Sequence, residues 1–170
     1  MNAPMSPPSA AGLGVLIQEV SRLFRRRFEQ RARAAALPLT RNQCSVLAAV
    51  ARDEGVTQAA LAQYLDLEPI TLVRLIDGLA AAGLLQRRGN PRDRRVRMLH
   101  LTEAALPLLE QIHAVRFALR EDALAGLPAE RRVQLVSDLH LLKRNLLGMM
   151  TSGDGGETAA PAAPAPQSAL

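Results

Sequence analysis

Apolar residues recur every three to four positions along several stretches of the chain, which is the spacing of one buried face of an α-helix. The clearest stretch begins at Pro69, which suits the first turn of a helix, and stops at Gly83, a common helix terminator. Its apolar positions are Leu72, Ile76 and Leu79. Thr71 and Arg74 lie off this stripe, one turn apart, so we expect both on an exposed face.

The same spacing predicts five further helices, at about residues 13–36, 41–52, 58–65, 103–125 and 129–147. Thr40 begins a capping box, and Thr57 caps the helix that follows. Thr102 is expected to cap the fifth helix, where Pro107 would remove one backbone hydrogen bond and bend the first turns. Gly148 is expected to end the last helix. These signals indicate a mainly α chain of about six helices.

Between the fourth and fifth helices the pattern changes from helical to alternating, as in a β-hairpin. A turn sequence at residues 89–91 separates a short apolar start from an alternating run at residues 96–101. From Gln86 to Arg97 there are six Arg and one Asp, a net charge of +5 that equals the formal net charge of all 170 residues. Like charges repel, so this concentration favours an anionic partner over a solvated charged loop.

The two short helices before the hairpin, with their tight connection, form a helix-turn-helix whose second helix can enter a major groove. The order helix, turn, helix, basic hairpin and long helix resembles that of the MarR family, and the amino-acid sequence is most similar to its SlyA branch. The resemblance covers about residues 13–148. Its matching residues are Gln58, Leu61, Ala62, Glu68, Leu72, Val73, Arg74, Asp77, Leu79, Gly83, Leu84, Asp93, Arg94, Arg95, Leu101, Thr102, Glu103, Pro107 and Leu108.

The resemblance implies a winged helix-turn-helix, with a small β-hairpin wing, in which the N- and C-terminal helices of two subunits interlock as a homodimer. The long helices also carry more apolar surface than a single winged helix needs to cover. Both ends of the chain are rich in Ala, Pro or Gly and are expected to be disordered. The expected organisation is tails at 1–11 and 149–170 around one domain at 12–148, with a DNA-binding lobe at about 40–102 and dimerisation helices at about 12–36 and 103–148.

Expected DNA contacts follow from where each side chain falls on these elements. Arg74 can pair with guanine O6 and N7 in the major groove, although a surface arginine without a partner remains the alternative. Thr57 and Gln58, at a helix start, are expected to bind phosphate. The expected base-edge contacts of the second helix are Pro69, Ile70, Thr71 and Arg74.

In the hairpin, one arginine is expected to enter the minor groove, where a narrow A/T-rich sequence deepens the negative potential. Arg94 is the first candidate, and Arg95 can exchange roles with it. Asp93 would orient an arginine through a bidentate pair, because an acid at a DNA surface otherwise repels phosphate. The expected hairpin contacts are Arg87, Arg92, Asp93, Arg94 and Arg95.

Composition excludes several other classes. Hydrophobic residues make up 48% of the chain and aromatic residues only 2%, which predicts a globular core of Leu, Val and Ala. One cysteine and three histidines leave no disulfide and no zinc set, so no metal or cofactor is expected. No serine lies on a glycine elbow, and no acid pair stands beside a phosphate loop, so no enzyme is predicted. With no apolar run that could span a bilayer and no signal peptide, we expect a cytoplasmic, nucleoid-associated protein without membrane contact.

The prediction is a homodimeric regulator that binds palindromic double-stranded operator DNA. The resemblance implies release by a small anionic aromatic ligand, such as a phenolic acid, lodged between the DNA-binding lobe and the dimer helices. A first alternative is redox sensing through Cys44, although a thiol in that helix is usually a small core hydrophobe. A second is a winged helix that only binds protein, which would not need six arginines in its hairpin.

Overall fold

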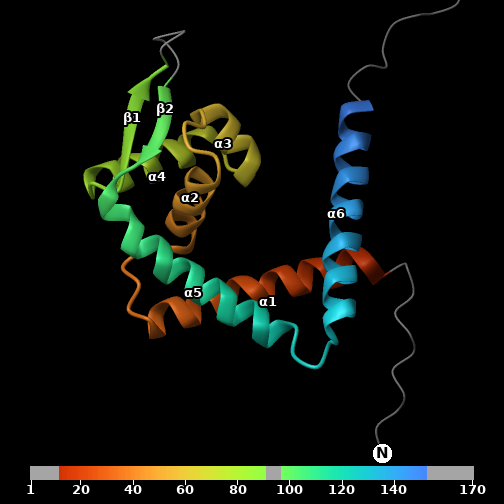
Figure 1. Ribbon diagram of the computed structural model, residues 1–170. Helices are drawn as coiled ribbons and strands as arrows, with labels where there is room; N and C mark the ends of the chain where they lie inside the picture. The colour runs from red at the N-terminus through yellow and green to blue at the C-terminus, as the bar shows by residue number, and fades with distance from the viewer. Residues whose placement is uncertain (1–11, 91–96, 153–170) are drawn as a thin grey trace, which may run out of the picture. The chain divides into compact units, whose positions relative to one another are not determined.

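The computed structural model describes residues 12–90 and 97–152. Within them the chain is mainly helical, with six α-helices and a two-stranded hairpin (Figure 1), as the sequence predicts. Contacts divide the chain into a unit of residues 1–123 and a unit of residues 124–170, and each is described by itself. The elements are α1 Leu13–Ala34, α2 Arg41–Arg52, α3 Gln58–Leu65, α4 Pro69–Ala81, β1 Leu85–Gly89, β2 Arg97–Leu101, the 3-10 helix Glu103–Ala105, α5 Leu106–Ala123 and α6 Ala129–Ser152.

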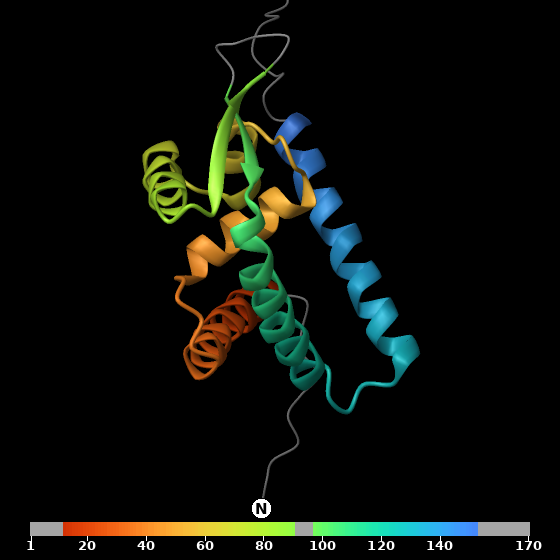
Figure 2. The same ribbon diagram turned by 60° about the vertical axis from the view of Figure 1, so that its left-hand side comes forward.

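The core of the first unit is built around α2, which packs against α3, α4, α5 and β2. Its fully buried residues include Val46, Leu47 and Val50, so the helix has little free surface. The predicted stripe of α4 is confirmed, because its three apolar positions are all buried. Figures 1 and 2 show the hairpin at one end of this unit and the crossing of α1 and α5 at the other. Helix α2 therefore packs both against the elements of the hairpin end and against the helices of the opposite end.

Local signals begin and end the helices as the sequence predicts in the DNA-binding lobe. Thr40 Oγ1 accepts from the Gln43 backbone N–H at 3.3 Å, and Gln43 Oε1 accepts from the Thr40 backbone N–H at 2.8 Å, which completes the capping box. Thr57 Oγ1 accepts from the backbone N–H of Ala60 at 3.2 Å. Gly83 follows α4 with a φ of +71°, a conformation that glycine adopts without strain.

Three predictions about helix ends are wrong. A 3-10 turn precedes α5, which begins only at Leu106, so Pro107 lies in the first turn, where a backbone N–H has no helical partner to lose. The Thr102 hydroxyl donates to the Gly83 carbonyl oxygen at 2.6 Å instead of capping the helix. At the other end, α6 continues through Gly148 to Ser152, since an internal glycine costs only about 1 kcal/mol.

The segment at residues 55–57 forms backbone hydrogen bonds with β2 of the hairpin, which the sequence analysis did not identify. The Gly55 N–H donates to the Leu99 carbonyl at 2.9 Å, and the Leu99 N–H donates to the Val56 carbonyl at 3.0 Å. Thr57 forms an isolated antiparallel bridge with Met98. The start of the helix-turn-helix is therefore hydrogen-bonded to the base of the wing.

The apolar stripe expected along α1 is exposed over most of its length. Leu16, Val20 and Phe24 expose 47%, 43% and 40% of their surface, and only Phe28 of the expected stripe is buried. In α6 the apolar positions Val136 and Leu139 are also half exposed. Among the residues described, no helix is long and apolar enough to cross a membrane. The exposed apolar positions of α1 and α6 leave both helices able to bind another protein surface.

Candidate nucleic-acid interface

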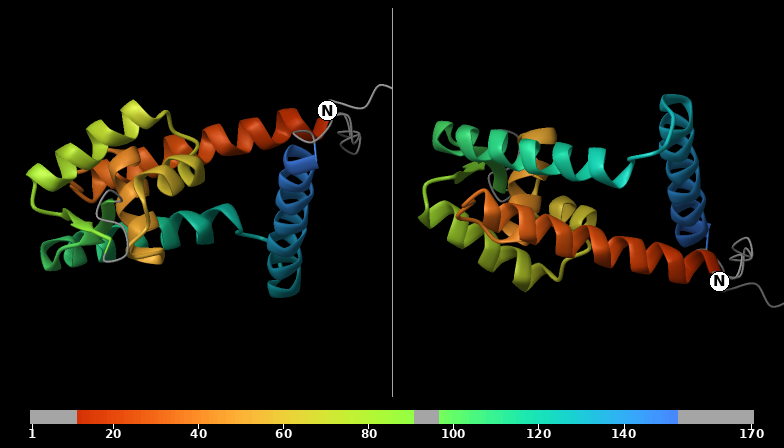
Figure 3. Two further views of the ribbon diagram at one scale, coloured as in Figure 1. Left: turned by 90° about the horizontal axis from the view of Figure 1, so that it is seen from above. Right: turned by 90° about the horizontal axis from the view of Figure 1, so that it is seen from below.

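The predicted face of α4 is exposed, and both views of Figure 3 place this helix at the outside of the first unit. Ile70 exposes 62% of its surface, and Pro69, Thr71 and Arg74 are exposed beside it. Within the residues described, Arg74 has no ion-pair partner, so its guanidinium can take an external acceptor. The buried stripe fixes the other side of the helix against α2 and α3, which holds this face outward.

At the start of α3, Thr57 and Gln58 are half-buried. Thr57 already accepts a hydrogen bond from Ala60, and its hydroxyl hydrogen is still available for donation to a phosphate. Its bridge to Met98 ties this helix start to β2. Thr57 therefore lies beside the wing, with Gln58 next to it at the first position of α3, which a sequence pattern alone cannot show.

The wing pairs β1 with β2 in antiparallel register, from Leu85 opposite Leu101 to Gly89 opposite Arg97. Arg88 and Arg97 are exposed near its outer end. Arg87, predicted as a DNA contact, is paired with Asp77 of α4, with Nη2 and Oδ1 separated by 2.5 Å. The predicted contacts Arg92, Asp93, Arg94 and Arg95 lie outside the described residues.

A pocket of about 220 Å³ lies where α1, α2 and α5 meet. Arg25, Arg41 and Arg116 line it from three different helices. Arg41 Nε lies 4.0 Å from Glu29 Oε1, and Arg116 has no carboxylate partner among the described residues. The remaining lining is aromatic, aliphatic or hydroxyl: Phe24, Phe28, Ser45 and Leu119. A small anion with an apolar body fits this lining.

Arg116 and Ser45 also line a second pocket of about 280 Å³ on the side of α2 that faces α3. There the Arg52 guanidinium carbon lies 3.8 Å from the centroid of the Tyr64 ring. The surrounding protein desolvates the Arg116 guanidinium and lowers its pKa. The two pockets therefore share Ser45 and Arg116 as lining residues.

Cys44 is fully buried in α2. Burial raises the pKa of its thiol above the ordinary value, and the nearby Arg116 charge only partly opposes this shift. A thiol that stays protonated and has no access to solvent reacts slowly with peroxide. These observations favour the core interpretation of Cys44 over redox sensing.

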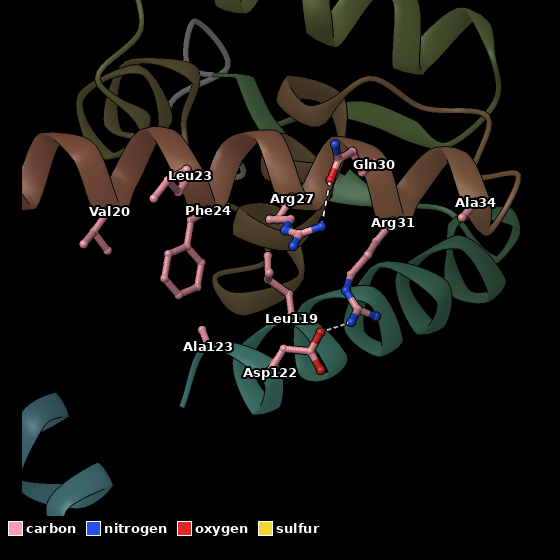
Figure 4. A pocket seen from close by; sticks show the side chains of 10 residues that line it. All are labelled: Val20, Leu23, Phe24, Arg27, Gln30, Arg31, Ala34, Leu119, Asp122 and Ala123. Carbon is pink, nitrogen blue, oxygen red and sulfur yellow. Dashed lines mark hydrogen bonds and ion pairs between the residues drawn. The ribbon is translucent and has the colours of Figure 1, made fainter. Parts of the chain in front are cut away.

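A cavity of about 630 Å³ lies between α1 and the end of α5 (Figure 4). Val20 and Phe24 form its apolar wall on α1, and Leu119 faces them from α5. Arg31 of α1 is paired with Asp122 of α5 at one edge. This open apolar hollow continues the exposed stripe of α1.

The chain is similar in sequence and in fold to known proteins. Residues 37–96 match the family model described as the MarR family. The structure of transcriptional regulator PA3341 is 31% identical, over 80% of this chain and 98% of that one, with a TM-score of 0.71. Wild-type MarR from E. coli, in its apo form, is 27% identical, over 79% of this chain and 96% of that one, with a TM-score of 0.65.

The chain belongs to the MarR family. Members of this family are winged-helix transcriptional regulators and not enzymes. The predicted family and the prediction that the chain is not an enzyme are therefore confirmed. Membership implies DNA binding and dimerisation. CouR from Rhodococcus jostii RHA1, whose structure holds p-coumaroyl-CoA, is 26% identical, over 76% of this chain and 90% of that one, with a TM-score of 0.67.

The sequence analysis of this MarR-family chain missed the arginine pocket and the role of Asp77. Arg25, Arg41 and Arg116 are far apart in the chain, and each alone looks like an ordinary surface arginine on a helix. Asp77 was identified only as a family match and not as a partner of Arg87. The ten-residue separation of these two opposite charges, across a helix end, carried no signal in the sequence pattern.

Proposed function

We propose that this protein is a homodimeric regulator, of the SlyA-like branch, that binds palindromic operator DNA in the cytoplasm and releases it when a small aromatic anion binds. The observation that carries the proposal is the exposed polar face of α4 beside a basic hairpin. In this arrangement α4 enters the major groove and Arg74 contacts a guanine edge. Thr71, Ile70 and Pro69 lie at the same groove, and the wing follows the minor groove.

The backbone of the DNA is bound by groups around that helix. Thr57 and Gln58 take phosphates at the start of α3. The arginines of the wing tip, Arg94 first and Arg95 as its substitute, supply the minor-groove contact. Arg92 adds charge near the phosphates, and Asp93 orients its arginine neighbour. This division assigns sequence discrimination to α4 and most of the salt-dependent affinity to the wing.

The direct test of DNA binding starts from a genomic fragment library, from which purified protein selects bound fragments. Sequencing should return one palindrome whose half-sites are separated by about one helical turn, 10 to 10.5 base pairs from centre to centre. The selected duplex and a scrambled version are then compared by fluorescence anisotropy over a salt series. Equal affinity for the two duplexes would contradict a sequence-specific regulator and favour the alternative of a protein-binding winged helix.

The second subunit covers the exposed apolar surfaces. The cavity between α1 and α5 continues the stripe formed by Leu16, Val20 and Phe24. We place the apolar face of the partner subunit's α6 against it, because water-exposed stripes of this length are rare in monomers. Dimerisation through these helices sets the distance between the two copies of α4.

The effector binds in the pocket lined by Arg25, Arg41 and Arg116. A guanidinium group pairs with a carboxylate in a bidentate manner, and Phe24 and Phe28 supply an aromatic wall for a single ring. The aromatic acyl ligand of CouR supports an effector of this chemistry. Since the pocket joins α1 and α5 to α2, an occupant that prefers one arrangement of these helices shifts the population toward a spacing that cannot bind both half-sites.

Effector release is tested with p-coumarate and p-coumaroyl-CoA as probes against protein bound to its selected duplex. Either probe should release DNA from the parent protein, and Arg116→Gln should require at least about tenfold more of it, since one charged hydrogen-bond donor is lost. Arg120→Gln is the matched control, because Arg120 lies one turn further along α5 and pairs with Glu121. An identical response of parent, test and control variants would remove the pocket from the mechanism.

A further inference from the structure

A salt bridge joins α4 to the wing strand that follows it. Asp77 is exposed on α4 one turn after Arg74, and its Oδ1 lies 2.5 Å from Arg87 Nη2 on β1. The partners are ten residues apart and face each other across the turn at Gly83. The contact therefore links α4, which is proposed to enter the major groove, to the wing, which is proposed to follow the adjacent minor groove.

Alternation along β1 decides which of two neighbouring arginines can make this contact. Leu85 and Arg87 share one face of the strand, and Arg87 pairs in register with the fully buried Leu99. The stem of Arg87 thus lies along the core side of the hairpin, and its charged end reaches α4. Arg88 belongs to the other face and is exposed. Of these two arginines, Arg87 is the one placed to hold the wing to the helix.

Among the residues described, side chains join the wing to α4 and to the turn after it at two places. At the base of the hairpin the Thr102 hydroxyl donates to the Gly83 carbonyl at 2.6 Å. Further along β1, Arg87 binds Asp77. The backbone hydrogen bonds of Leu99 with Gly55 and Val56 hold β2 to the segment before α3, whereas the Arg87–Asp77 pair joins β1 directly to α4.

We propose that Asp77 and Arg87 form a positioning pair that sets the angle of the wing against α4, and that Arg87 acts through Asp77 and not through a DNA phosphate. This inference rests on the proposed DNA-binding function. The Arg87 and Asp77 side chains are 30% and 59% exposed, so their pair adds little to the stability of the fold. Its effect lies in the fraction of molecules whose wing and α4 meet the DNA together.

The test is Asp77→Asn, because the two roles of Arg87 predict opposite results. This substitution removes a negative charge from the DNA-binding side, so a phosphate-binding Arg87 would be released to bind DNA more tightly and raise the salt slope by about one unit for each subunit. A positioning pair predicts weaker binding of the selected duplex, by about three- to fivefold per wing and about 10- to 25-fold for a dimer, with the slope unchanged. Circular dichroism and thermal unfolding confirm that the variant is folded.

Glu68→Gln is the matched control, since Glu68 is an exposed acid at the start of the same helix whose side chain makes no capping hydrogen bond. Its affinity should equal or exceed that of the parent. The exchange Asp77→Arg with Arg87→Asp should recover most of the affinity that either single reversal loses, because the attraction is restored with the charges exchanged. Tighter binding by Asp77→Asn, or no recovery in the exchanged protein, would overturn the inference, whereas a parent that binds no duplex specifically would overturn the proposed function instead.

Discussion

At the scale of single residues, two arginines on either side of the Gly83 turn, Arg74 and Arg87, have different surroundings. Arg74 is exposed on α4 without an ion-pair partner among the described residues, whereas Arg87 is bound to Asp77. Charge count alone assigns both to DNA. The tertiary contacts distinguish them, because Arg74 is exposed and open to an external acceptor whereas Arg87 already has a carboxylate partner. The contact of each with DNA stays a prediction.

Arg74→Ala should therefore weaken binding of the selected palindrome by about 1 to 3 kcal/mol for each lost base contact and reduce the difference between specific and scrambled duplexes. The measurement is fluorescence anisotropy on both duplexes at several salt concentrations. Arg120→Ala, on α5, serves as a control that removes a charge away from the α4 face. If a folded Arg74→Ala binds the palindrome as the parent does, α4 is not the element that discriminates sequence.

At the scale of the elements, Gly83 and Gly148 have different roles, although the sequence analysis assigned them the same one. Both Gly83 and Gly148 were expected to end a helix. Gly83 does so with a φ of +71°, whereas Gly148 lies within α6. The sequence signal for a stop is the glycine itself, but the stop requires a left-handed conformation that only the packing after α4 imposes.

Substitution by alanine should separate these roles. Gly148→Ala should raise the free energy of unfolding by about 0.5 to 1 kcal/mol, because no atom lies within 4 Å of the added Cβ and alanine favours a helix. Gly83→Ala should lower it by about 1 kcal/mol or more, because the left-handed conformation strains a side chain although the space around it is open. Urea unfolding measures both. Equal effects of the two substitutions would show that Gly148 also terminates its helix in solution.

At the scale of the whole molecule, large exposed apolar side chains are concentrated on α1 and α6, outside the DNA-binding lobe. The stripe of α1 and the apolar positions of α6 expose far more than isolated surface residues do. Deleting residues 129–170 should produce aggregated or unfolded protein, because the partner's stripe loses its cover. Deleting only residues 153–170 should leave the dimer and its specific DNA binding nearly unchanged.

Light scattering coupled to size-exclusion chromatography measures the oligomeric state of both truncations, and anisotropy measures their DNA binding. The short truncation controls for the loss of chain length. A well-folded monomer after the longer deletion would contradict a dimer held by α6.

The sequence by itself determined the elements whose cause is local. The apolar period of α4, the capping box at Thr40 and the alternation of the hairpin each depend on residues a few positions apart, so the mainly α fold and its wing were predictable. The exposed positions of Thr71 and Arg74 followed from the same period. Only their actual contacts with DNA stay a prediction.

The tertiary structure decided everything that depends on residues meeting across elements. It brought Arg25, Arg41 and Arg116 from three helices to one pocket, and it joined Asp77 to Arg87. It also showed that the stripe of α1 is buried only at Phe28 within one subunit. Helical and strand periods state which face of an element is apolar, but the partner of that face is set by packing between segments distant in the chain.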